Sequence, residues 1–347
     1  ADDPRGPGAF GFDEWCSVTN YFDMNPLMSR KGVFTEFKGD PSEVIVNEAL
    51  AFIKARVADK TPFFTVIWTG SPHNPWMASD SDCEPFSSLD ANSRNHYGEL
   101  VAFDRSLGTL RKGLRDCGAA DNTLVWYCSD NGGHPHISPA TTGGLRGFKG
   151  SVYEGGLRVP GIIEWPARIR PRVTLVPAST LDIFPTIADQ LGLPESALLQ
   201  PCDGASLTPL FTADASTRAK PIPFRFEGRG AWLDHSHKLV ATSIEKQTFE
   251  LYDLAADPAE SRDLAAEQPE RLAAMKRAFL AWHASVERSV AGGDYAEGRV
   301  RPDEPQSRPW SEDPRYAPYL DDFRKRPEYR QLLAPKKGAG RRAGKGT

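Results

Sequence analysis

Asp130 and Asn131 stand where an apolar run ends abruptly. The run Thr123-Leu-Val-Trp-Tyr-Cys-Ser129 has the β-branched and aromatic character of a buried strand, and two glycines follow the polar pair. A strand in an open α/β sheet delivers its last side chains to the edge where ligands bind. A carboxylate beside a carboxamide offers the hard oxygen ligands that Ca²⁺ or Mg²⁺ requires. The pair therefore predicts a metal site, with a plain strand-ending turn as the alternative.

His73 is a second candidate for chemistry. It lies in Ser71-Pro-His-Asn-Pro-Trp76, directly after the apolar run 63–69. Two prolines stiffen such a loop, so the imidazole would be aimed at a fixed point rather than packed in a core.

Lys149 is a third candidate. It lies with Arg146 in a loop that holds five glycines between residues 144 and 156. Cationic side chains on a glycine-rich loop can cradle an oxyanion, with the lysine acting as a point charge. A solvated basic loop is the alternative.

Composition limits what these residues can serve. A chain of 347 residues with 39% hydrophobic and 25% charged residues is ordinary for a globular protein, and it is long enough for one large domain plus a smaller one. The net charge of −4 gives no reason to expect nucleic acid or an anionic membrane as partner. No apolar run approaches the roughly 20 residues of a membrane helix. Five cysteines without a CxxC pair argue against zinc and fit no complete disulfide framework.

The order of elements predicts an α/β domain over residues 1–212, an antiparallel sheet plus helix over 213–290, and an extended, disordered basic and Pro-rich tail over 291–347. Irregular entry loops are expected over residues 1–40. Further expected elements are a helix opened by Asp40-Pro41-Ser42, a buried strand 63–69, helices over 97–114, 182–191 and 267–290, and strands at 159–165, 224–226, 237–241 and 249–252.

The motifs occur in a distinctive order: a strand and Pro-His-Asn-Pro, a helix, a strand and Asp-Asn-Gly, then the Gly-Lys loop and Glu154-Gly-Gly-Leu-Arg-Val-Pro160. This chain resembles the sulfatase family of the alkaline-phosphatase-like superfamily from Gly11 to about Trp282. The resemblance implies a layered sheet with helices on both faces, lacking its N-terminal part, plus a small C-terminal subdomain with an antiparallel sheet.

The resemblance also implies roles for four residues. Asp130 and Asn131 match the second pair of Ca²⁺ ligands in that family. His73 matches the histidine that contacts the substrate sulfate, and Lys149 matches the lysine that binds the same group. A divalent cation, an ammonium and an imidazole converging on a sulfuryl group would offset charge that develops in the transition state. Arg146 takes no role from the family.

The family's nucleophile, a formylglycine made in Cys/Ser-x-Pro-x-Arg, has no match in this sequence. Cys83-Glu-Pro-Phe-Ser87 lacks the arginine and follows Pro-His-Asn-Pro, and Ala1-Asp2-Asp3 has no strand before it. We therefore expect the chain to be the C-terminal portion of a sulfuric ester hydrolase. The formylglycine and the other half of the Ca²⁺ ligands would belong to the full-length parent protein, and the chain alone would be inactive.

Two alternatives stay open. The chain could be a truncated remnant or pseudoenzyme that only binds an anion or partner. It could also be a phosphodiesterase or phosphonate hydrolase of the same superfamily, in which His134 and His136 would bind a second, softer metal.

A sulfated small molecule or glycan is the expected partner, with no nucleic acid and no membrane. The sequence leaves localisation and redox state undetermined; the resemblance favours a periplasmic or secreted protein. If a first strand and its following helix are missing, a sheet edge is exposed, so we expect poor solubility or marginal stability.

Overall fold

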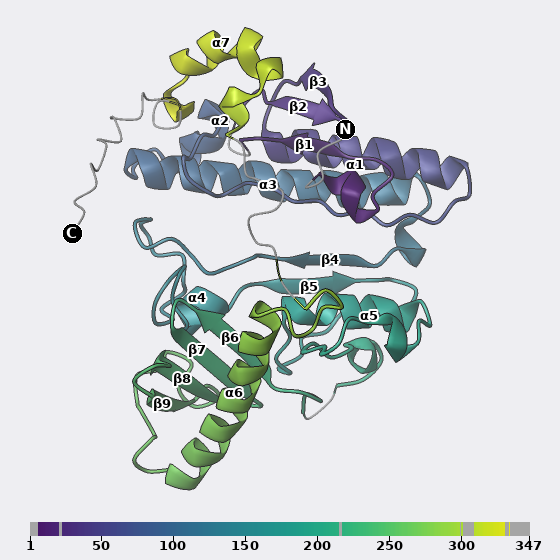
Figure 1. Cartoon of the computed structure of the whole chain (residues 1–347). Coiled ribbons are helices and arrows are strands. Elements are labelled where there is room, and N and C mark those ends of the chain that lie inside the picture. Colours follow the sequence, from purple (N-terminus) through teal and green to yellow (C-terminus); the bar gives the residue numbers. More distant parts are fainter. Residues whose placement is uncertain are drawn as a thin grey trace, which may run out of the picture. The chain divides into compact units, whose positions relative to one another are not determined.

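The computed structural model describes residues 6–20, 23–214, 217–298, 300, 309–329 and 333. The chain divides into two compact units, one of Ala1–Leu114 with Pro302–Thr347 and one of Arg115–Arg301. This division differs from the domain limits expected at residues 212 and 290, which stay a prediction. Figure 1 labels the elements, and each unit is described by itself.

Two long helices form the body of the first unit. α1 spans Pro41–Ala58 and opens where the sequence predicts, and α3 spans Ala91–Asp116, beginning six residues before the predicted 97–114. Asp40 caps α1 by accepting a hydrogen bond from the Ser42 amide, and Pro41 occupies the first helical turn, where its missing N–H costs nothing. The helices lie along one another (Figure 1) and are joined by an ion pair between Arg105 and Glu43.

The expectation of irregular entry loops is wrong for part of residues 1–40. The chain forms an antiparallel three-stranded meander of β1 Cys16–Val18, β2 Leu27–Arg30 and β3 Val33–Glu36. Lys31 and Gly32 both have positive φ and turn the chain between β2 and β3. The strands are three or four residues long, which is too short for a two-residue period to be evident.

The expectation of a disordered tail is wrong for residues 309–329, and the rest of that prediction falls largely outside the described residues. Three short helical turns and α7 Leu320–Lys325 place aromatic side chains against β2. Tyr316, Phe323 and Tyr329 are buried with Leu27 in one cluster. Tyr329 also donates its hydroxyl hydrogen bond to the buried Asp23. Regular aromatic spacing within a Pro- and Arg-rich composition was the overlooked signal.

Residues 63–69 are not the buried strand that the apolar run predicts. In the described part of the chain they have no strand partner, and their side chains alternate between half-buried and exposed. Phe64 is 61% and Trp68 86% exposed. The backbone keeps the two-residue alternation of a strand, but no neighbouring strand in the described residues pairs with it, so one row of apolar side chains stays open to solvent.

The second unit begins with a two-stranded ribbon. β4 Val125–Cys128 pairs antiparallel with β5 Gly161–Glu164, so that Cys128 faces Gly161 and Val125 faces Glu164. The short helix α4 Glu154–Leu157 lies between the two strands in sequence, and the short helix α5 Ile183–Gln190 follows β5. Gly192, with φ of +66°, ends α5 as predicted.

A four-stranded antiparallel sheet and a helix complete the second unit. The sheet has the order β6 Ile222–Phe226, β7 Arg229–Asp234, β8 His237–Ser243 and β9 Thr248–Asp253. β7 was not predicted, because glycines at 228 and 230 mask it. α6 Pro269–Val290 lies across the sheet (Figure 1) and buries Met275 and Phe279 against it.

The two faces of this sheet pack against different elements. The helix face, which carries Leu239, Ala241 and Leu251, packs on α6. The loop face, which carries Ala231, Val240 and Tyr252, packs on Val152 and its neighbours. Side chains directly opposite each other on paired strands share a face. The register therefore shows on which face each remaining residue of the sheet lies.

Within the part of the chain that the structure describes, no helix combines the length and apolar character that a bilayer crossing needs.

Candidate functional site

Asp130 and Asn131 lie just beyond the end of β4. The Asp130 side chain is exposed and Asn131 is half-buried. The Asn131 amide donates a hydrogen bond to Asp130 Oδ2, and the Ser129 hydroxyl donates to the Asn131 backbone carbonyl at 3.2 Å. These contacts hold the carboxylate and the carboxamide side by side, as two ligands of one ion would have to be.

Two glycines let the strand end touch the loop of residues 144–156, here called the Lys149 loop. The Gly132 amide donates to the Gly156 carbonyl at 2.9 Å, and the Lys149 amide donates to the Gly133 carbonyl at 3.0 Å. A Cβ on Gly132 would lie 1.9 Å from the Gly155 carbonyl oxygen, a distance that no side chain tolerates. The structure therefore brings Asp130, Asn131 and Lys149 into one region, with the Lys149 side chain exposed.

Arg146 does not form the oxyanion cradle that the sequence suggested. Its guanidinium donates to the Tyr252 hydroxyl at 2.8 Å, to the Glu260 backbone carbonyl at 3.0 Å and to the Tyr153 hydroxyl at 3.1 Å. Both tyrosine hydroxyls donate to Glu250, and burial together with that carboxylate raises the pKa of Tyr153 to about 12. Arg146 thus fastens the Lys149 loop to the loop face of the C-terminal sheet.

A buried ion-pair cluster fastens the other end of the loop. Lys238 is 0% exposed, and its ammonium lies 2.8 Å from the Glu154 carboxylate and 2.9 Å from that of Glu260. Glu260 also accepts a hydrogen bond from the Glu154 backbone amide at 2.6 Å. Burial raises the pKa of Glu260, and the ammonium opposes that rise. The sequence did not predict this cluster, because its members come from three distant segments.

His73 belongs to the first unit. Its ring Nδ1 lies 2.7 Å from the Asn74 backbone carbonyl, which can only accept, so Nδ1 carries the proton of this bond. Its backbone amide donates to the Gly70 carbonyl at 2.9 Å, and both X–Pro bonds of the loop are cis. The hydrogen bond at Nδ1 fixes the ring orientation, and the role expected of His73 stays a prediction.

Glu99 of α3 is hydrogen-bonded to the segment that carries His73, residues 71–76, here called the His73 loop, and to the residue that follows it. It is only 2% exposed, accepts a hydrogen bond from the Met77 amide at 2.6 Å and bonds the Ser71 hydroxyl. Burial raises the pKa of Glu99 to about 9, with the nearby Asp40 adding to the rise. Glu99 is therefore a neutral acid at pH 7 that holds both ends of the loop. No sequence signal distinguished it from the other helix carboxylates.

The fit of a Ca²⁺ ion can be judged from the donor set. Asp130 and Asn131 offer hard oxygens, which suits Ca²⁺, but Ca²⁺ takes six to eight such ligands. Among the described residues no group of three or more His, Cys, Asp or Glu side chains could hold a metal. The pair thus fits the chemistry of the ion and supplies only part of its coordination.

His134 and His136 follow the same strand end. Their rings lie 5.4 Å apart in an edge-to-face arrangement, and the His136 amide donates to His134 Nδ1 at 3.2 Å. The His134 Nδ1 atom is thus occupied, and among the described residues these two rings belong to no group of three or more His, Cys, Asp or Glu side chains that could hold the second, softer metal.

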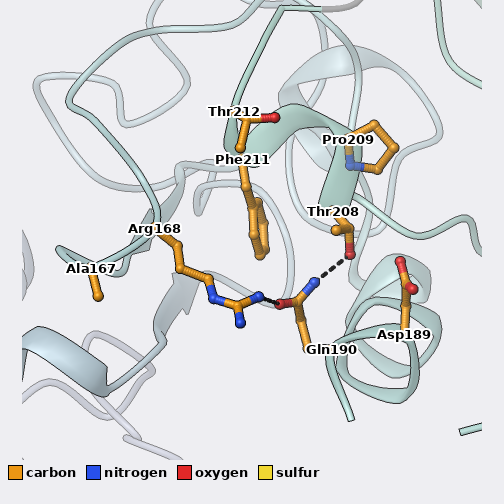
Figure 2. Close-up of a pocket in the computed structure, with 8 residues that line it drawn as sticks. All are labelled: Ala167, Arg168, Asp189, Gln190, Thr208, Pro209, Phe211 and Thr212. Carbon is orange, nitrogen blue, oxygen red and sulfur yellow. Dashed lines mark hydrogen bonds between the residues drawn. The ribbon is translucent and has the colours of Figure 1, made fainter. Parts of the chain in front are cut away.

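A pocket of about 570 Å³ lies elsewhere in the second unit (Figure 2). It is near the end of the ribbon where β4 begins, away from Asp130, because Ala167 donates to the Asp121 carbonyl there. Arg168 donates a hydrogen bond to Gln190, which in turn donates one to Thr208, so these polar side chains of the lining are hydrogen-bonded to one another.

Comparison with known proteins identifies relatives of the whole arrangement. The family model described as Sulfatase matches residues 3–193. N-acetylgalactosamine-6-sulfatase of Canis lupus familiaris is 32% identical over 216 residues, which is 60% of this chain and 38% of the relative. Arylsulfatase A of Homo sapiens is 30% identical over 254 residues, which is 63% of this chain and 48% of the relative. The chain thus spans well under two thirds of the length of these relatives.

Solved structures agree with the fold. The crystal structure of Ps i-CgsB in complex with k-i-k-neocarrahexaose superposes with a TM-score of 0.71 at 26% identity, covering 81% of this chain and 68% of that one. The putative sulfatase yidJ from Bacteroides fragilis gives 0.64 at 21% identity, covering 78% and 65%. The predicted fold class, α/β with the alkaline-phosphatase-like architecture, is confirmed. Every strand pair in the described residues is antiparallel.

Proposed function

The chain belongs to the sulfatase family, and we propose that it provides the sulfate-binding part of a sulfuric ester hydrolase. The reaction adds water to a sulfate ester and releases an alcohol and inorganic sulfate. We assign the binding of the sulfate group to Lys149, and the binding of one Ca²⁺ ion to Asp130 and Asn131. A sulfate-contacting role for His73, which belongs to the other unit, is proposed on the resemblance to the family alone.

One observation carries this proposal. The Lys149 loop is hydrogen-bonded directly to the two glycines that follow Asp130 and Asn131, so a cationic side chain and two hard oxygen ligands share one surface. A bound Ca²⁺ ion would add positive charge beside the sulfate oxygens. The chain's own contribution is an exposed ammonium on a loop that Arg146 and Glu154 hold from either end. Such fixed charges need no reorganisation when the anion binds.

The expected nucleophile is a formylglycine, and the printed sequence contains no Cys/Ser-x-Pro-x-Arg from which to make one. We therefore propose that these 347 residues bind a sulfate ester without hydrolysing it, and that hydrolysis belongs to the parent protein. A sulfated glycan is the proposed substrate class. N-acetylgalactosamine-6-sulfatase is named for an amino sugar sulfate, and the structure of Ps i-CgsB contains a bound saccharide.

The test is binding of 4-nitrophenyl sulfate to the full chain by calorimetry in Ca²⁺ buffer. Loss of a charge-assisted hydrogen bond should weaken binding about tenfold in Lys149→Ala, and His73→Ala should weaken it too. Lys246→Ala is the matched control, because Lys246 is exposed on the turn between β8 and β9. If Lys149→Ala binds the ester as tightly as the unsubstituted chain does, the assignment is refuted. Rapid release of 4-nitrophenol would refute the claim that the nucleophile is missing.

A further inference from the structure

A second pocket, of about 330 Å³, lies between the Lys149 loop and the loop face of the C-terminal sheet. The loop contributes Arg146, Ser151 and Tyr153 to its lining, and the sheet contributes Arg229 and Thr242. The pocket thus begins two residues along the chain from Lys149 and belongs wholly to the second unit.

The register of the sheet explains why Arg229 faces this pocket. Arg229 lies opposite Phe226 on β6, and both belong to the loop face. A Cβ placed on Gly150 would lie 3.9 Å from the Phe226 ring, so the ring borders the Lys149 loop. The neighbouring arginine of β6, Arg225, points to the helix face and forms an ion pair with Glu287 of α6.

The two arginines of the pocket differ in what holds them. Arg146 is fixed by three hydrogen bonds and stacks on the Tyr153 ring at 3.8 Å, so its charge is already in place. Among the described residues Arg229 has one ion-pair partner, the exposed Glu227 at 3.3 Å, and it lies over the Phe226 ring at 5.4 Å; exposed contacts of this kind contribute little. Its guanidinium can therefore turn to another anion at small cost.

The carboxylate nearest to Arg146 is that of Glu250, and it offsets part of the Arg146 charge. Glu250 accepts hydrogen bonds from the hydroxyls of Tyr153 and Tyr252 at 2.7 and 2.8 Å and lies 3.9 Å from Arg146. Both hydrogen bonds and the contact with Arg146 involve the same carboxylate oxygen, Oε2. The loosely held guanidinium of Arg229 is therefore the group that could bind a new anion, in a pocket that Arg146, Ser151 and Thr242 also line.

We propose that this pocket is a subsite for a second anionic group of the substrate, a sulfate or carboxylate on the unit next to the sulfate ester. The subsite rests on the proposed function, because the ester sulfate at Lys149 defines which group is the second one. The substrate class follows: a polyanionic saccharide in which neighbouring sugars both carry charge. The exposed edge of Phe226 gives an apolar surface for a sugar ring at the rim.

The experiment compares four probes on the full chain by calorimetry at low ionic strength in Ca²⁺ buffer. They are a monosulfated monosaccharide and three disaccharides that keep this sulfate and carry a second sulfate, a carboxylate or no charge on the neighbouring sugar. The unsubstituted chain should bind the doubly charged disaccharides about tenfold more tightly than the neutral disaccharide. Whichever doubly charged probe binds more tightly identifies the second group.

Arg229→Ala should remove most of that tenfold gain and leave the monosaccharide unaffected. Arg229→Lys, which keeps the charge but not the planar fork, should give an intermediate affinity and guards against a folding defect in the alanine variant. Arg225→Ala, on the opposite face of the same sheet, is the matched control and should bind all four probes like the parent.

Each result decides between the two claims. If Arg229→Ala binds the doubly charged probes as the parent does, or if the neutral disaccharide binds equally well, the subsite is refuted while the sulfate site stands. If the monosaccharide fails to bind but the doubly charged probes bind in an Arg229-dependent manner, the pocket binds an anion, the proposed function is refuted, and the assignment of the pocket to a second group of a sulfate ester is refuted with it. If no probe binds the parent, both fall.

Discussion

Glu99 links burial to the orientation of a candidate site residue. Its carboxyl is nearly inaccessible and bonds both Met77 and Ser71, the ends of the segment that carries His73. A carboxyl buried in this way disfavours its charged form, which is why its pKa rises to about 9. The residue therefore serves as a neutral hydrogen-bonding group at pH 7.

The raised pKa of Glu99 predicts how stability changes with pH. The folded chain binds this proton more tightly than the unfolded chain, whose pKa is near 4.5. The stabilising contribution is complete below about pH 4.5 and is lost as the pH rises toward 9. Glu99→Gln keeps a neutral acceptor for the Met77 amide, so its unfolding midpoint should fall less between pH 5 and pH 9 than that of the parent.

Thermal unfolding followed by circular dichroism across this pH range checks the prediction. Glu84→Gln, an exposed carboxyl of the same unit, is the control and should follow the parent at every pH. Parallel pH profiles for Glu99→Gln and the parent would mean that Glu99 is ionised in the folded state.

At the scale of elements, the Glu154–Lys238–Glu260 cluster joins three separate parts of the second unit. Glu154 belongs to α4, Lys238 to β8, and Glu260 to the turn after β9. Two buried carboxylates share one buried ammonium, and removing one partner of a buried ion pair leaves charge without compensation. The position of the Lys149 loop depends on this balance.

Lys238→Met should therefore lower the free energy of unfolding by about 3 to 5 kcal/mol at pH 7. Burial already raises the pKa of Glu260, so this carboxyl favours the folded chain below about pH 4.5 and loses that contribution as the pH rises. The deficit of Lys238→Met should accordingly shrink at pH 4. Urea unfolding at both pH values measures it, with Lys246→Met as the surface control; an equal deficit at both pH values would contradict the account.

How much of the fold the sequence predicts depends on the length of each element. α5 and α6 were predicted within two residues and the start of α1 was predicted from its cap, whereas α3 begins six residues before the predicted 97–114. The meander of β1 to β3 was missed because three-residue strands carry no period. The apolar run 63–69 was overinterpreted, because a strand needs partners that its own sequence cannot supply.

The candidate site divides in the same way. Asp130, Asn131, His73 and Lys149 were found because each lies in a short local motif, and the resemblance to sulfatases assigned them roles. Arg229, Glu99 and Lys238 were missed because their importance arises only when distant segments meet. The misjudged role of Arg146 has the same origin, since its partners lie more than a hundred residues along the chain.

At the scale of the whole molecule, exposed apolar side chains bear on solubility. Trp68, Val173 and Leu175 are each at least 86% exposed. Together with the unpaired segment 63–69 they support the prediction, still untested, of poor solubility or marginal stability for the isolated chain. A cooperative unfolding transition at high temperature would contradict it.

The central claim is that Asp130, Asn131 and Lys149 form one site, in which a Ca²⁺ ion and a sulfate ester lie side by side. Two ligands that attract each other within one site must raise each other's affinity by the same factor. Calorimetric titration of 4-nitrophenyl sulfate with and without Ca²⁺ measures that factor directly. The account predicts that Ca²⁺ tightens binding of the ester several-fold in the parent and has no effect in Asp130→Ala. An affinity that is the same in the parent with and without Ca²⁺ would contradict it.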